Sequence, residues 1–286
     1  MAASTAALRG ITKQYKNFTL GPVDMTVPAG SIVGLIGENG AGKTTLLKIL
    51  CGVNRADNGT VDLLGGSPAD AATRAKIGVV FEDAFFYGSF NAAQAARSLA
   101  GMYGAQWNAD SFSAYLRRFG LDAGKKLKEY SRGMRLKLSL AAALAHDPEL
   151  LVLDEATAGL DPVVRGELLD LFLEFIQDER HSIVMSSHIT ADLEQIADSI
   201  AYLHNGQLLF QESKDDLLQE YGVLHCGEDV LTSLPAGLVV FTRRGAYGCE
   251  SLVRERRTVQ ELLPEAVCDA ARLDDIMRFY SGRDAQ

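Results

Sequence analysis

The stretch of sequence that decides the fold is Gly37-Glu38-Asn39-Gly40-Ala41-Gly42-Lys43-Thr44. It matches the pattern G-x-x-x-x-G-K-[ST], and it lies between the apolar run Ser31–Ile36 and the helical sequence TTLLKIL. In this pattern the glycines let backbone N–H groups curl around phosphate oxygens, and the positive end of the following helix adds to the attraction. The sequence therefore predicts a phosphate-binding loop that joins a strand to a helix.

The loop also predicts a role for its polar side chains. Lys43 would reach the β- and γ-phosphates of a nucleotide, and Thr44 would place its hydroxyl on Mg²⁺. The remaining residues predicted to contact the nucleotide belong to the loop and the start of its helix: Gly37, Glu38, Asn39, Gly40, Ala41, Gly42 and Thr45.

A second acidic site is predicted at the end of another strand. The residues Glu149–Glu155 read E-L-L-V-L-D-E, which indicates a buried strand followed by two acids. We expect Asp154 to hold the Mg²⁺ shell and Glu155 to act as the general base that orients the attacking water. The alternative is that these acids only cap the next helix. Because no Asn-Lys-x-Asp motif is present, a GTPase is not favoured.

Composition narrows the class of protein further. The chain has 286 residues, of which 47% are hydrophobic, enough for one large packed domain or two small ones. Its net charge of −9 argues against a general nucleic-acid binder. The longest apolar runs are far shorter than the roughly 20 residues that cross a bilayer, so we expect a cytoplasmic protein. Four cysteines without a CxxC pair give little support for zinc or disulfides.

The order of the predicted elements indicates an α/β fold. Strands and helices alternate, which favours a mostly parallel sheet covered on both faces. A helical stretch from about 83 to 146 reads as an inserted subdomain, and Asn205-Gly206 suits the turn of a hairpin over Ile200–Phe210. We predict one domain over 1–222 and a small C-terminal α+β accessory region over 223–286. In that region we expect short strands up to Arg254 and helix-like segments from there to the end.

A third motif indicates the subclass. The residues Tyr130-Ser131-Arg132-Gly133-Met134 open a helix, and Ser131 lies 23 residues before Asp154. With this motif the sequence resembles the ABC-type ATPases, the nucleotide-binding subunits of ABC transporters, whose signature usually reads Leu-Ser-Gly-Gly-Gln. The family brings the serine and the glycine N–H, here Ser131 and Gly133, to the γ-phosphate held by the opposite subunit.

The resemblance extends over about Leu8 to Phe210 and implies further roles. It implies a P-loop NTPase core of ABC ATPase type with an N-terminal antiparallel β region. Tyr15 resembles the aromatic residue that stacks on adenine, although it also fits a core or edge tyrosine. The stretch Ala158–Asp161 resembles the loop that contacts the partner subunit. His188 resembles the histidine that reads the γ-phosphate, which makes it a catalytic residue beside Glu155 and Lys43.

One position departs from the family pattern. A glutamine that contacts Mg²⁺ or the attacking water normally follows the strand Ile77–Val80, and here the corresponding residue is Glu82. A carboxylate also accepts from water or binds Mg²⁺, so we expect Glu82 at the metal and nucleotide. Together, Glu82 and Arg132 resemble a branch that exports antimicrobial or amphipathic peptides and related small lipophilic compounds.

The segment after Glu82 is expected to face a membrane partner. It reads Asp83-Ala84-Phe85-Phe86-Tyr87, and three consecutive aromatic rings in a loop are typical of a binding surface. The alternative is that these rings fill the core of the helical subdomain.

The resemblance therefore implies an ATPase subunit that uses ATP and Mg²⁺, forms a homodimer and drives a separate membrane permease from the inner face of the cell membrane. It implies no nucleic-acid partner. Two alternatives stay open. One is a soluble ABC ATPase acting in translation or DNA repair. The other is a regulatory subunit that binds ATP without turnover, which the presence of Glu155 disfavours.

Overall fold

The computed structural model describes residues 4–81, 86–235, 237–245 and 248–282. The chain divides into two compact units. One consists of Met1–Ile189 with Ala201–Gln211, and the other of Thr190–Ile200 with Glu212–Gln286. The second unit includes segments that precede residue 222, and the division into domains at that residue stays a prediction.

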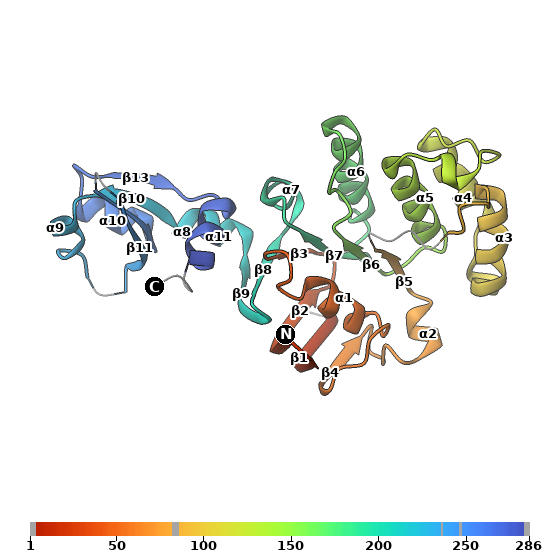
Figure 1. Cartoon of the computed structure of the whole chain (residues 1–286), viewed down its shortest axis with the longest axis horizontal. Coiled ribbons are helices and arrows are strands. Elements are labelled where there is room, and N and C mark those ends of the chain that lie inside the picture. Colours follow the sequence, from red (N-terminus) through yellow and green to blue (C-terminus); the bar gives the residue numbers. More distant parts are fainter. Residues whose placement is uncertain (1–3, 82–85, 236, 246–247, 283–286) are drawn as a thin grey trace. The chain divides into compact units, whose positions relative to one another are not determined.

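A six-stranded sheet forms the centre of the first unit (Figure 1). Its strands, in spatial order, are β5 (Ile77–Val80), β6 (Leu150–Asp154), β7 (Ser182–Ser187), β3 (Ile32–Ile36), β8 (Ser199–His204) and β9 (Gln207–Ser213). The pairs from β5 to β3 are parallel, and every residue of β3, β6 and β7 is buried. Strands that are buried along their whole length belong to sheets that are covered on both faces, which confirms the predicted α/β class.

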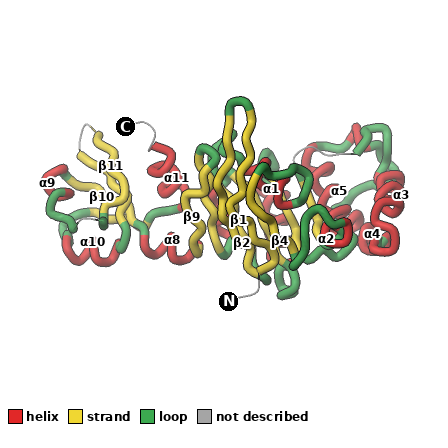
Figure 2. Tube along the Cα trace, turned by 90° about the horizontal axis from the view of Figure 1, so that it is seen from below, coloured by secondary structure: helices red, strands yellow, loops and turns green. Residues whose placement is uncertain are grey.

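A three-stranded antiparallel sheet covers part of this core. It contains β2 (Phe18–Pro28), β1 (Ser4–Tyr15) and β4 (Asn58–Leu63) in that order, and Figure 2 shows the three strands side by side. Their inward side chains share one hydrophobic core with the helix α1 (Lys43–Leu50) and with β3, β6 and β8. A short helix, α2 (Ala71–Arg74), follows β4.

Three helices gather into a separate cluster within the first unit. They are α3 (Ala92–Tyr103), α4 (Ala109–Arg118) and α5 (Arg132–Leu144), with the short turns η1 (Gly104–Gln106) and η2 (Leu127–Glu129) between them. Asn91 and Gln94 form a capping box at the start of α3, and Asn108 caps α4. Phe112, Leu138 and Tyr130 lie in the buried core that the helices share. The next helix, α6 (Pro162–Phe175), begins with Asp161 as its N-cap and proline at its first position.

The second unit is built on a four-stranded antiparallel sheet in the order β11-β12-β10-β13. Its elements are α7 (Thr190–Ile196), α8 (Lys214–Glu220), β10 (Gly222–Cys226), α9 (Glu228–Leu231), β11 (Val239–Gly245), β12 (Gly248–Val253), α10 (Arg256–Leu262), β13 (Val267–Ala270) and α11 (Leu273–Ser281). The expectation that only helix-like segments follow Arg254 is therefore wrong, because β13 forms a strand between α10 and α11. This strand is mostly exposed, so its sequence lacks a long apolar run.

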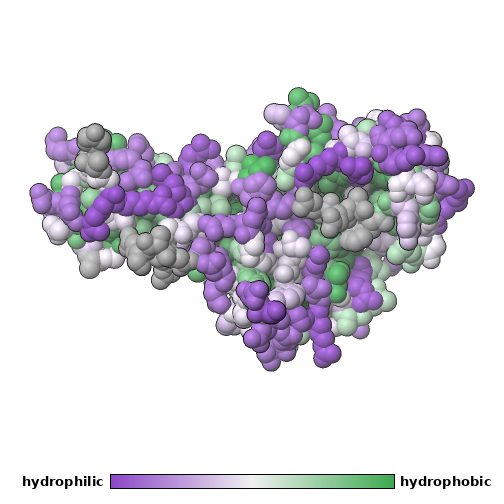
Figure 3. All heavy atoms as spheres, viewed as in Figure 1, coloured by the Kyte–Doolittle hydropathy of each residue, from purple (hydrophilic) through white to green (hydrophobic). Residues whose placement is uncertain are grey.

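No helix of the described residues is long and apolar enough to cross a membrane. On the face drawn in Figure 3, hydrophilic residues cover most of the surface and hydrophobic residues form small separate patches.

The hairpin between β8 and β9 supports the phosphate-binding loop. Asn205 and Gly206 both have positive φ angles, 47° and 79°, as the predicted two-residue turn requires. The N–H of Gly206 donates to the carbonyl of Ala41 at 3.0 Å, and its own carbonyl accepts from the N–H of Gly21 at 2.7 Å. The turn therefore fixes the loop against β2.

We expect Gly206→Ala to lower the free energy of unfolding by about 2–4 kcal/mol. A Cβ at this position would lie 2.1 Å from the carbonyl oxygen of Thr19, and the left-handed backbone adds strain. The matched control is Gly120→Ala, which has φ +63° but meets no atom within 4 Å and should cost only about 1 kcal/mol. Urea unfolding measures both, and equal losses would contradict this role of Gly206.

Candidate functional site

The phosphate-binding loop has the geometry that its sequence predicts. It leaves β3 at Ile36 and enters α1 at Lys43. A Cβ on Gly37 would lie 2.2 Å from the carbonyl oxygen of Leu203, so only glycine fits there. Gly42 is the N-cap of α1, with φ +109° and no side-chain cap. The N–H groups of the first helical turn have no intrahelical acceptors, so an uncapped start of α1 suits an external anion.

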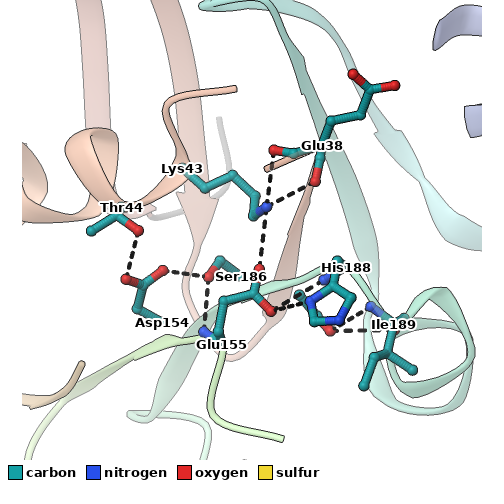
Figure 4. Close-up of polar contacts among 10 residues, drawn as sticks. Glu38, Lys43, Thr44, Asp154, Glu155, Ser186, His188 and Ile189 are labelled. Atoms are coloured by element: carbon teal, nitrogen blue, oxygen red, sulfur yellow. Dashed lines mark hydrogen bonds and ion pairs between the residues drawn. The ribbon is translucent and has the colours of Figure 1, made fainter. Parts of the chain in front are cut away.

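Lys43 lies inside this loop and is almost fully buried. Its Nζ donates to the carbonyl oxygens of Gly37 at 2.8 Å and Glu38 at 3.4 Å, and it lies 3.2 Å from Oε1 of Glu155 (Figure 4). The loop therefore holds its one lysine against the end of β6. A cation in this position is oriented toward whatever anion the loop accepts.

The side chains predicted to bind Mg²⁺ lie next to each other. The Thr44 hydroxyl donates to Oδ2 of Asp154 at 2.8 Å, and the Ser186 hydroxyl donates to Oδ1 at 2.6 Å (Figure 4). A hydroxyl and a carboxylate are the hard oxygen ligands that Mg²⁺ prefers. The residues present therefore fit a magnesium ion shared with phosphate oxygens.

Glu155 and His188 form the second half of the network. Oε2 of Glu155 lies 2.6 Å from Nδ1 of His188, and it also accepts from the His188 N–H at 3.4 Å. Because a carboxylate only accepts hydrogen bonds, this contact places the ring proton on Nδ1. His188 is thus held by the acid that the sequence predicts to be the general base.

Ser186 is the functional residue that the sequence interpretation missed. Its hydroxyl donates to Asp154 and accepts from the N–H of Glu155 at 3.0 Å, while its carbonyl accepts from the same N–H at 3.1 Å. Glu155 has a φ of +52°, a strained value for a non-glycine residue, and these bonds hold it there. The sequence does carry a signal for this residue: a serine near the end of a buried strand, two residues before His188.

The Cys51 thiol is buried, close enough to Asp154 to feel its negative charge, and stays protonated. Burial, and then the negative charge of Asp154, raise the pKa of Cys51 to about 12. No thiolate at this position therefore competes with the oxygen ligands near neutral pH.

Three further predicted residues, Tyr15, Ser131 and Gly133, are described by the structure and make other contacts than those of this network. Ser131 caps α5 by accepting from the N–H of Met134 at 3.2 Å, and Gly133 lies in the first turn of that helix. Tyr15 is 42% exposed beside Phe18, so it is not a core residue. Glu82 lies outside the described residues. The roles assigned to all of these residues stay predictions.

Comparisons with known proteins agree with this fold and loop. The family described as ABC transporter matches residues 20–158. An uncharacterized ABC transporter ATP-binding protein of Synechocystis, sll0415, is 38% identical over 73% of this chain, which spans 60% of that protein's length. The bacitracin transport ATP-binding protein BcrA of Enterococcus faecalis is 34% identical over 72% of this chain and 68% of its own.

A solved structure of the ATP-binding subunit of an ABC transporter superposes with a TM-score of 0.68. It is 28% identical in sequence, and the match covers 75% of this chain and 92% of that one. The fold and the loop thus define an ATPase with a phosphate-binding loop. The chain belongs to the ABC transporter ATP-binding proteins, and it is an ATPase of that family.

We expect Ser186→Ala to lower ATP turnover at least tenfold and to raise the Mg²⁺ concentration needed for half-maximal rate. The change removes the hydroxyl that orients Asp154 and Glu155, and removing such a supporting group costs about 10–100-fold. Steady-state ATPase assays at several Mg²⁺ concentrations measure this effect.

The matched control is Ser182→Ala at the other end of β7. Its hydroxyl bonds to Thr5 Oγ1 at 2.7 Å, far along the strand from the carboxylates. This variant should lose stability but keep its Mg²⁺ dependence. If both variants behave alike, the effect of Ser186 is structural only.

Proposed function

We propose that this chain is the ATP-hydrolysing subunit of an exporter, which works as a homodimer around two ATP molecules on a separate membrane permease. One observation carries the proposal. The Ser186 hydroxyl links Asp154, which is bonded to Thr44, with the backbone of Glu155, which holds His188. Lys43 lies beside the same Glu155. This set contains a cation that can bind phosphate, two metal ligands, a general base and a residue that orients the base.

Each residue has a task in this proposal. The loop and Lys43 would bind the phosphates, and Thr44 and Asp154 would hold a magnesium ion. That ion would neutralise negative charge on the phosphates. Glu155 accepts the proton of the attacking water, and His188 keeps the Glu155 side chain in place through Nδ1. Because the Glu155 side chain is only 14% exposed, few competing solvent contacts disturb its orientation.

The signature residues support a dimer. Ser131 and Gly133 lie at the N-terminus of the 13-residue helix α5, where backbone N–H groups favour an anion. They take no part in the contacts that join Lys43, Asp154 and Glu155. An identical second subunit would use them at its own nucleotide, as the family resemblance implies, so a homodimer suffices.

An apolar cavity of about 390 Å³ beside the helical cluster supports a permease partner. It is lined by β5, Phe86, Tyr87 and α3, and both Tyr87 and Met102 at its rim are more than 70% exposed. Phe86, in contrast, packs partly against the buried core of the helices. Tyr87 thus fits the docking alternative and Phe86 fits the core alternative. Residues 83–85 lie outside the described part of the chain.

The class of substrate is argued from the relatives. BcrA is a bacitracin transport protein, and this chain shares its ATP-binding region at 34% identity. We infer that peptides or small lipophilic compounds are exported, from the inner face of the cell membrane. A soluble ABC ATPase outside transport remains the second candidate, and the exposed apolar rim at Tyr87 and Met102 disfavours it.

We expect Glu155→Gln to bind ATP with unchanged affinity and to lose turnover by about 10²–10⁴-fold, because an amide does not accept the proton of water. Calorimetry and a phosphate-release assay separate the two properties. Glu149→Gln is the matched control, since Glu149 precedes the same strand and pairs with Lys76 at 3.0 Å. Turnover in Glu155→Gln equal to that of wild type would remove Glu155 as the base. A wild-type protein that binds but never hydrolyses ATP would favour a regulatory subunit.

The docking surface gives a separate prediction. We expect Tyr87→Ser combined with Met102→Ser to weaken co-purification with a co-expressed permease from the same genome, because the apolar rim is lost. Their exposure means that the melting temperature should change little. The control is Val53→Ser, at an apolar residue 63% exposed elsewhere on the same unit. Equal loss of permease in the control, or unfolding of the double variant, would count against this surface.

A further inference from the structure

The signature segment and the loop after Glu155 are in direct contact within one subunit. Gly159 has a φ of +69°, and a Cβ built on it would lie 2.9 Å from Nη1, 3.2 Å from Cζ and 3.7 Å from Nε of Arg132. All three nearest atoms belong to one guanidinium group. The side chain of Arg132 therefore lies against the bare backbone of Gly159, at a position where any larger residue would displace it.

Other contacts continue along the same interface. A Cβ on Gly133 would lie 3.5 Å from Leu160 and 4.0 Å from Val164, and Lys137 Nζ pairs with Glu167 at 2.8 Å. The start of α5 is thus packed against the segment Ala158–Asp161 and the start of α6. Among these contacts, the one made by Arg132 lies closest to Glu155 in the sequence, because it reaches Gly159.

This segment is tied closely to the catalytic acid. The N–H of Ala158 donates to the carbonyl of Glu155 at 3.2 Å, and the N–H of Leu160 donates to that of Thr157 at 3.4 Å. Asp161 then caps α6 by accepting from the N–H of Val164 at 3.1 Å. A shift of Gly159 would therefore also move the strained backbone of Glu155.

We propose that Arg132 is a positioning residue that couples the two halves of the ATPase machinery contributed by one subunit. This inference rests on the proposed function, in which Ser131 and Gly133 serve the partner's nucleotide while Glu155 serves the subunit's own. Arg132 stands between Ser131 and Gly133, and through Gly159 it holds the segment that follows Glu155. A signature with glycine at this position has no side chain to make that contact. The coupling makes hydrolysis at the two sites of the dimer cooperative.

Replacing Arg132 separates its geometry from its charge. In Arg132→Gly we expect the Hill coefficient for ATP to fall from above one to about one, and kcat to fall roughly three- to tenfold. The KM for ATP should stay within about twofold, because the loop around Lys43 is untouched. Arg132→Lys should behave like Arg132→Gly, since a lysine ammonium does not reproduce the planar guanidinium group that contacts Gly159. Full rescue by lysine would overturn the proposal in favour of a charge effect.

A double-variant cycle tests whether Arg132 acts through Gly159. Gly159→Ala places a methyl group on the guanidinium, so it should reduce kcat and cooperativity as well. If the contact is the cause, Arg132→Gly combined with Gly159→Ala should lose less than the product of the two single losses. A loss equal to that product shows independent residues and overturns the proposal.

Arg135→Ala is the control for removal of a cation from the same exposed turn of α5, since the contacts to Gly159 come from Arg132. It should keep the wild-type Hill coefficient, and the melting temperatures of the single arginine variants should agree closely with that of wild type because both arginines are exposed. A wild-type dimer that hydrolyses ATP with a Hill coefficient of one overturns this inference alone. A wild-type protein without ATPase activity overturns the proposed function instead.

Discussion

The parallel register of β6 and β7 is the constraint on which the site depends. In this register Asp154 lies opposite Ser186, and the neighbouring pair of β3 and β7 brings Ile36 opposite Ser187. The phosphate-binding loop, the two acids and His188 therefore leave the sheet at the same edge. A slip of one residue would turn Asp154 to the other face and separate it from Thr44. The buried apolar side chains of all three strands oppose such a slip.

The site combines local strain with a compact set of opposite charges. Glu155 adopts a positive φ angle, which costs about 1–3 kcal/mol and persists only when neighbouring groups hold it. Ser186 supplies two such bonds, and the ion pair between Lys43 and Glu155 supplies a further contact. This ion pair is almost removed from solvent, so breaking one partner alone would leave an uncompensated charge. The ion pair that helps to hold Glu155 thus also determines the net charge next to the phosphate-binding loop.

Short-range patterns made most of the fold and the site predictable. The loop Gly37–Thr44 and the buried strand before Asp154 are each one continuous stretch of sequence. Residue spacing within each stretch is therefore enough to predict them. β4 was missed because its residues are mostly polar and exposed, so it carries no hydrophobic pattern. Ser186 and the contact of Arg132 with Gly159 depend on which strands and helices become neighbours. That information is spread over long sequence separations, and residue spacing does not reveal it.

The second compact unit also combines segments that are far apart in the sequence. A change in the pattern of predicted strands and helices near residue 222 predicts a domain boundary there. The second compact unit also contains α7, which begins two residues after His188. Within that unit, Glu194 of α7 accepts from the N–H of Leu273 at 2.8 Å and lies 3.7 Å from the Arg272 guanidinium. Leu193 and Ile276 are both fully buried. Because a helix N-terminus leaves N–H groups without partners, the start of α11 needs such an acceptor, and Glu194 meets that need. The second compact unit therefore includes α7, a helix that precedes residue 222 in the sequence, while the domain boundary at that residue stays a prediction.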